Sequence, residues 1–133
     1  MEYKREPRDT DLSRPVIASA EVMSSTNAPE RFQNTVLRPI IKMQHDLLLM
    51  YYRQYLDHKA IDFASWSSER QTEFINQSLS RDLQLKNQLN GMIIGHFTTS
   101  EYQAYKLISQ EINKRIISII KERLMTHLDA FAD

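Results

Sequence analysis

The histidines are the side chains of this chain that could act as metal ligands or as acid–base groups near neutral pH. There are four of them, at positions 45, 58, 96 and 127. None belongs to a Glu-x-x-His or His-Glu-x-x-His pattern of the kind that helical zinc and di-iron sites use. The chain has no cysteine, which excludes disulfides, thiolate metal sites and cysteine nucleophiles. We therefore expect no metal and no cofactor, although a metal site assembled from distant residues stays open.

A second set of polar residues could hold a small molecule. Asp82, Glu111 and Arg115 are charged, and His96 follows the only glycine-containing segment. Glu111 and Arg115 are four residues apart and so share a helix face, where such pairs contribute a few tenths of a kcal/mol. The simple interpretation is a solvated surface. The alternative is a ligand-binding or enzymatic pocket near Asp82, His96, Glu111 and Arg115.

The two glycines, Gly91 and Gly95, are four residues apart and lie on one face of a predicted helix. Phosphate loops and nucleophile elbows need more glycine than this, so no catalytic residue is assigned. A glycine inside a helix costs about 1 kcal/mol relative to alanine. We therefore expect the pair to allow close packing against another helix and Gly95 to end its own helix.

Residues 47–52 are apolar around the whole circumference of a predicted helix. A helix of this kind is covered on more than one side, and in a small bundle the second cover can be another subunit. We therefore predict a homodimer whose contact includes Leu49, Met50 and one or more of Tyr52 and Tyr55. Tyrosines can also stack on bases, but no basic stripe accompanies these.

Helical spacing of apolar residues accounts for the chain from Ala28 onward. It predicts a short helix that starts at Asn27 or Ala28 and ends at about Leu37, or else a kink there caused by Pro39, and then a long helix to about His58. A connection over 59–66 follows. The next helix is opened by a Ser68–Gln71 capping box, with Ser67 as the other possible cap, and it reaches the glycine pair, either unbroken or with a break near Ser80.

The last predicted helix covers roughly residues 100–131 and is opened by a Thr98–Glu101 capping box. It would be about 45 Å long, which exceeds what a core of this size needs to cover. Its far end is therefore expected to serve assembly. The fold class is all-α, an antiparallel bundle of three to four main helices. Residues 1–28 form a flexible or loosely docked arm, and residues 29–133 form the helical domain.

Composition narrows the function classes further. Seventeen basic side chains balance seventeen acidic ones, so a general nucleic-acid binder is not expected. The longest apolar run, residues 47–52, is too short to span a bilayer. Residues 1–20 lack the apolar core of a signal peptide. We therefore expect a cytoplasmic protein without membrane contact.

Several segments of the chain are distinctive, namely LRPIIKMQHDLL at 37–48, LNGMIIGHFT at 89–98, EINKR at 111–115 and the shorter segments Arg81-Asp82, Glu101-Tyr102 and ERL at 122–124. Together they resemble a family of short, uncharacterised, all-helical bacterial proteins, some of which have been given the name glyoxalase automatically. The likeness covers about residues 30–128. It implies a shared helical fold, does not require histidine at positions 45 or 96, and supplies no catalytic residues.

The sequence thus leads to two hypotheses of different class. The first is a cytoplasmic helical interaction or assembly module that acts as a homo-oligomer, with an unidentified protein as a possible further partner. The second is a small-molecule-binding protein or an enzyme, which the glyoxalase name also implies, with the polar pocket described above. Whether the protein is an enzyme stays open.

Overall fold

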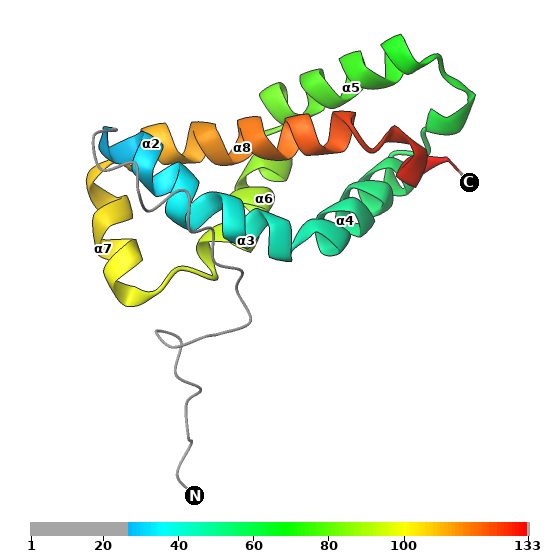
Figure 1. Cartoon of the computed structure of the whole chain (residues 1–133). Coiled ribbons are helices and arrows are strands. Elements are labelled where there is room, and N and C mark those ends of the chain that lie inside the picture. The colour runs from blue at the N-terminus through cyan, green and yellow to red at the C-terminus, as the bar shows by residue number, and fades with distance from the viewer. Residues whose placement is uncertain (1–26, 133) are drawn as a thin grey trace, which may run out of the picture.

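The computed structural model describes residues 27–132, and the regular structure in this range is helical throughout (Figure 1). This confirms the all-α fold class. The predicted arm lies outside the described residues, except for its last two. The helices are α2 (Ala28–Phe32), α3 (Arg38–Met43), α4 (His45–His58), α5 (Ser68–Arg81), α6 (Leu83–Ile94), α7 (Thr99–Leu107) and α8 (Ser109–Met125), with a π-helical segment at Gln33–Leu37 and 3-10 turns at Phe63–Ser65 and Leu128–Phe131.

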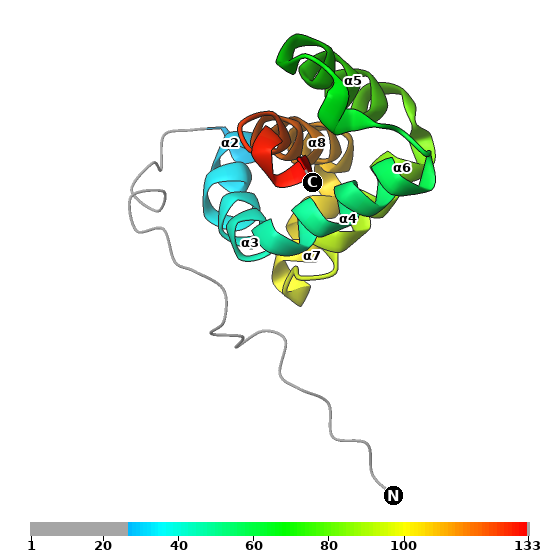
Figure 2. The ribbon, with the colours of Figure 1, turned by 90° about the vertical axis from the view of Figure 1, so that its right-hand side faces the viewer.

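Helix α8 lies at the centre of the molecule. It contacts α2, the π-helical segment, α5, α6 and α7, and Figure 2 shows these elements arranged around it. Its buried side chains recur mainly every four residues, as one helix face requires. They are Ile112, Ile116, Ile117, Ile120 and Leu124. No helix within residues 27–132 is long and apolar enough to cross a membrane.

The prediction of one long helix over residues 100–131 is wrong. Ile108 has φ −136° and separates α7 from α8. The break lets Tyr105 pack edge-on against Phe97, with ring centroids 5.4 Å apart, while its hydroxyl donates to Asn113 Oδ1 at 2.8 Å. Helix α8 has 17 residues and is about 25 Å long, so no overlong end projects from the molecule.

Pro39 does not break the first helical stretch as sharply as its chemistry predicts. Proline lacks an amide donor and its ring clashes with the carbonyl one turn earlier. The preceding Gln33–Leu37 segment is π-helical, and the Arg38 amide donates to the Gln33 carbonyl, five residues back. We attribute the continued helix to this wider turn. The break falls later, at Gln44, between α3 and α4.

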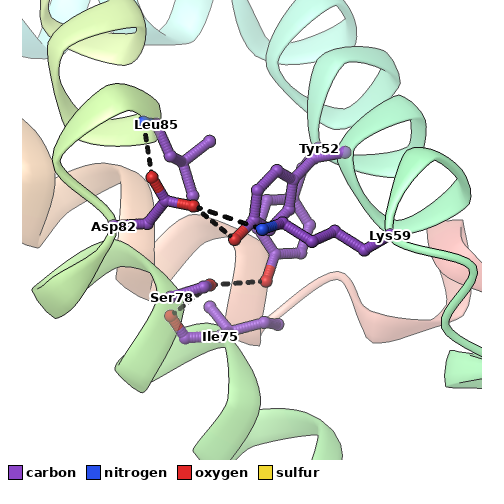
Figure 3. Close-up of polar contacts among 7 residues, drawn as sticks. Tyr52, Lys59, Ile75, Ser78, Asp82 and Leu85 are labelled. Atoms are coloured by element: carbon purple, nitrogen blue, oxygen red, sulfur yellow. Dashed lines mark hydrogen bonds and ion pairs between the residues drawn. The ribbon is translucent and has the colours of Figure 1, made fainter.

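Helix α4 buries Leu48, Tyr52 and Leu56, which are four residues apart. Tyr52 is fully buried, and its hydroxyl lies 2.8 Å from Ser78 Oγ of α5 (Figure 3). Its predicted place in a subunit interface is therefore wrong, because it belongs to the core of one chain. Leu49 is half-buried against the same core, and its place in that interface stays a prediction.

Met50 does face solvent, as the interface prediction requires. It is 69% exposed, and Leu47, one turn earlier, is 49% exposed. Tyr55, the fourth predicted interface residue, is half-buried and points toward α6, where it hydrogen-bonds to Asp82. Of the four predicted interface residues, Met50 is therefore the one that lies largely exposed on α4, and Leu47 is exposed beside it.

The prediction that Gly91 and Gly95 allow close helix packing is wrong. Gly91 is exposed, and a Cβ at its position would meet no atom within 4 Å. At Gly95 the nearest atom would be the carbonyl oxygen of Gly91 itself, at 3.1 Å. The core side of α6 is formed by Leu85, Leu89 and Ile93, and the glycines lie on the other side. Gly95 does follow the last residue of α6, as predicted.

The two predicted capping boxes have different outcomes. The Thr98–Glu101 capping box at the start of α7 is confirmed. For α5, the alternative cap is correct: Ser67 Oγ accepts from the Arg70 amide at 3.2 Å. The side-chain amide of Gln71 instead donates from Nε2 to the Phe63 carbonyl at 2.8 Å. This bond joins α5 to the connection before it.

The α4–α6 cleft as candidate functional site

Asp82 is the central residue of a polar cleft between α4 and α6. It is the residue between α5 and α6, two positions after the predicted break, and it caps α6. Its Oδ1 accepts from the Leu85 amide at 3.1 Å. Its Oδ2 accepts from the Tyr55 hydroxyl at 2.8 Å and lies 3.9 Å from Lys59 Nζ (Figure 3). Both oxygens are therefore fixed in position by α4 and α6 together.

Helix α4 supplies its cleft residues from one face. Tyr51, Tyr55 and Lys59 are spaced four residues apart, which places them on neighbouring turns. The Tyr51 hydroxyl donates to Gln88 Oε1 of α6, as Tyr55 does to Asp82. Because residue numbers rise along α4 while their partners' numbers fall along α6, the two helices run antiparallel here.

The end of α4 has a Schellman motif that places Lys59. The Ala60 amide donates to the Asp57 carbonyl at 3.0 Å, and the Ile61 amide donates to the Leu56 carbonyl at 3.1 Å. Ala60 has φ 55°, in the left-handed region that usually needs glycine. The helix stops here, and the Lys59 ammonium lies 5.4 Å from the centroid of the Tyr55 ring.

The cleft has a volume of about 400 Å³ and is open to solvent on one side. Its lining combines aromatic rings, amides and charged groups, with one aliphatic side chain. The lining residues are Tyr51, Gln54, Tyr55, His58, Lys59, Asp82, Gln84, Leu85 and Gln88. This mixture suits a polar ligand that is held by hydrogen bonds and by contact with the tyrosine rings.

The charge state of the cleft follows from its hydrogen bonds. The pKa of Asp82 is lowered, first by the hydrogen bond from Tyr55, then by the Leu85 amide, with a smaller contribution from Lys59. Burial, followed by the neighbouring Asp82, raises the pKa of Tyr55 to about 12. Burial and Asp82 also raise the pKa of Tyr51. At neutral pH the cleft therefore holds a carboxylate and two protonated phenols.

Lys59 pairs with that carboxylate, but the pair is loose. The N–O distance is 3.9 Å, and the side chains of Lys59 and Asp82 are 49% and 27% exposed. Ion pairs of this kind contribute about 0–1 kcal/mol to stability, because water screens them and the lysine loses conformational entropy. The ammonium can therefore leave the carboxylate at little cost.

The predicted cluster of Asp82, His96, Glu111 and Arg115 does not form. His96 follows the last turn of α6, at the end opposite Asp82, which places it about 20 Å away at 1.5 Å per residue. There its Nε2 is 2.9 Å from Gln44 Nε2. Local spacing could not reveal this separation, because Asp82 and His96 lie at the two ends of one helix.

Glu111 and Arg115 lie apart from both Asp82 and His96. Their side chains make the predicted ion pair along α8, with Arg115 Nε 3.0 Å from Glu111 Oε1. Arg115 also donates from Nη1 to Gln33 Oε1 at 2.9 Å. The pair therefore joins α8 to the π-helical segment and has no part in the cleft.

Sequence reasoning identified Asp82 as a ligand-binding residue but missed Lys59 and Gln88. A usable signal was present, because residues 51, 55 and 59 follow the i, i+4, i+8 spacing of one helix face. Which helix would lie opposite that face could not be read from the spacing. Within residues 27–132 there is no group of three or more histidine, aspartate or glutamate side chains arranged to hold a metal ion.

Comparisons of the chain with protein-family models, curated proteins and solved structures found no match. The resemblance to a family of helical bacterial proteins therefore stays a prediction. The function of the protein has to be inferred from the geometry and charge of the cleft.

Proposed function

We propose that this is a small-molecule-binding helical protein and that the α4–α6 cleft is its binding site. The observation that carries the proposal is the Asp82 carboxylate, which is ionised, oriented by the Tyr55 hydroxyl and the Leu85 amide, and 27% exposed in a cleft of about 400 Å³. A fixed charge of this kind gives a ligand orientation and specificity.

The chemistry of Asp82 and Tyr55 favours binding over proton transfer by these two groups. A general acid or base works best when its pKa is near the working pH. The pKa values of Asp82 and Tyr55 are displaced in opposite directions, downward and upward, away from neutrality. At neutral pH the two groups therefore serve as an acceptor and a donor of hydrogen bonds rather than as an acid and a base.

The proposal is tested by adding a library of small polar fragments to ¹⁵N-labelled protein and recording amide chemical shifts. We expect the shifts of binding fragments to cluster at Tyr51, Tyr55, Leu85 and Gln88. Shifts that instead cluster around Gln44 and His96, or around the Glu111–Arg115 pair, would move the binding site elsewhere. A library that shifts none of the cleft amides contradicts the proposal.

A second candidate function, homodimeric assembly, is favoured by Leu47 and Met50. These large apolar side chains are 49% and 69% exposed and lie three residues apart on α4. Covering such side chains completely is worth about 1.5–3 kcal/mol each. In this proposal the cytoplasm is the compartment, since a chain without cysteine suits a reducing environment.

We predict a wild-type dimer by light scattering at micromolar concentration and a folded monomer for the double variant Leu47→Glu and Met50→Glu. The fold should survive, because both side chains are exposed within one chain. Leu107→Glu, at an 86% exposed position of α7, is the matched control and should stay dimeric. A monomeric wild type would exclude the assembly function.

A further inference from the structure

We infer that the α4–α6 cleft recognises a small organic cation with a primary ammonium group, and that the Lys59 ammonium occupies the place of this group in the structure. This inference rests on the proposed function and specifies the class of its ligand. It depends on which groups surround the Lys59 side chain and on how loosely that side chain is held.

The Lys59 ammonium lies beside a carboxylate and an aromatic ring, the two kinds of group that bind amines. It lies 3.9 Å from Asp82 Oδ2 and 5.4 Å from the centroid of the Tyr55 ring (Figure 3 shows the carboxylate contact). A carboxylate neutralises an ammonium, and an aromatic face attracts it through the ring quadrupole. The structure therefore already contains a primary ammonium, bound by groups from α4 and α6.

Lys59 is suited to give up this position. It is the last residue before the left-handed turn at Ala60 and caps the end of α4. Its side chain is 49% exposed, and a salt bridge at 3.9 Å between partly exposed groups is weak. An incoming ammonium can replace it at Asp82, while Lys59 turns outward into water.

The rest of the cleft favours a cation that carries further polar groups. Gln54, Gln84 and Gln88 line it, and each amide has a carbonyl oxygen that can accept a hydrogen bond from a second amino group. The Tyr51 ring lies on the same wall as Tyr55. An anionic ligand would meet the Asp82 carboxylate, whereas a short diamine would find an acceptor at each end.

The test is calorimetric titration of the full chain with 1,4-diaminobutane, using 1,4-butanediol as the uncharged molecule of the same shape. We expect the diamine to bind at least tenfold more tightly than the diol. Asp82→Asn should weaken diamine binding at least tenfold, and it keeps the α6 cap because asparagine caps helices as well as aspartate does. Lys59→Gln should strengthen binding severalfold, since it removes the internal competitor.

Glu111→Gln removes a carboxylate outside the cleft and is the matched control, with unchanged affinity expected. Equal binding of diol and diamine, or Asp82→Asn binding as the wild type does, would overturn the ammonium inference while the cleft remained a binding site. Weaker binding by Lys59→Gln would also overturn it, because Lys59 would then be part of the recognition. Failure of the fragment library to shift the cleft amides would instead overturn the proposed function itself.

Discussion

His45 and His127 join the first turn of α4 to the chain that follows α8. Their ring centroids are 4.6 Å apart, and Arg123 Nη1 lies 3.0 Å from His45 Nδ1. Burial lowers the pKa of His45, and the charges of Arg123 and His127 lower it further, while Asp46 partly opposes them. The folded protein therefore holds the His45 imidazole neutral at a pH where the unfolded chain would protonate it.

This difference makes stability depend on pH. The unfolded state binds the proton more readily. The contribution of His45 to the free energy of unfolding should therefore be complete above about pH 6.5 and should be lost as the pH falls below that value. Urea unfolding at pH 7.5 and pH 5.5 should show a lower midpoint at pH 5.5. The pKa of Asp82 is lowered from 3.8, so this group changes stability only at a more acidic pH.

The variant His45→Gln should lose much of this pH dependence, whereas His58→Gln, at an exposed position, should keep it. If the two variants respond to pH alike, the dependence does not come from His45. In the folded chain the group that His45 contacts is the Arg123 guanidinium. This partner could not be predicted, because the two residues are 78 positions apart.

At the scale of single elements, the end of α4 carries a strained residue. Ala60 has φ 55° in a Schellman motif, where glycine is the usual residue. The left-handed conformation costs an alanine about 1–2 kcal/mol, part of which the greater flexibility of glycine in the unfolded chain would cancel. Ala60→Gly should therefore stabilise the protein by about 0.5–1 kcal/mol in urea unfolding.

Ala104→Gly provides the matched control for this variant. Ala104 is exposed in α7, where its backbone is helical, and the same change should there cost about 1 kcal/mol. Destabilisation by both substitutions would mean that the backbone at Ala60 is not left-handed in solution.

The exposed glycine of α6 gives a second prediction at this scale. Gly91→Ala adds a methyl group into open space and should stabilise the protein by about 1 kcal/mol, the helix propensity difference. Gly95→Ala should gain less, because its methyl group would lie 3.1 Å from the Gly91 carbonyl oxygen. Thermal unfolding of both variants tests this. A lower melting temperature for Gly91→Ala would show that another molecule packs against it.

Helix existence was predictable from apolar spacing, but several helix ends were not. The breaks at Gln44, Asp82 and Ile108 contain neither glycine nor proline, so no local signal marked them strongly. Asp82 is a partial exception, because aspartate is a good cap. The break at Ile108 accompanies long-range packing, because the turn there brings Tyr105 against Phe97.

For the whole molecule, the all-α class could be deduced from the helical period alone, whereas the cleft could not. The sequence assigned Tyr52 to a subunit interface because a core and an interface bury the same kinds of side chain. Only the packing of α4 against α5 distinguishes them, through the Tyr52–Ser78 contact at 2.8 Å. In the same way, Asp82 was recognised but its partners Tyr55 and Lys59 depend on how α4 and α6 meet.

The 3-10 turn at Leu128–Phe131 packs against residues that are far from it in the sequence. Phe131 is buried, with its ring 5.5 Å from that of Tyr52 and 5.8 Å from that of Phe63. Phe131→Ala should cost about 3 kcal/mol in urea unfolding, as expected for a large buried ring. Leu107→Ala, at an exposed site, should change stability by less than about 0.5 kcal/mol. Equal effects of the two would show that the turn does not pack on the core.

The connection between α4 and α5 also determines how this protein can be observed. It contains Trp66, the one tryptophan of the chain. Its ring lies 3.9 Å from the Arg70 guanidinium and is flanked by Phe63 and Phe74. Intrinsic fluorescence from tryptophan is therefore a local signal from this connection. Since the chain has no other tryptophan, a change in emission reports on the packing of this connection without an added dye.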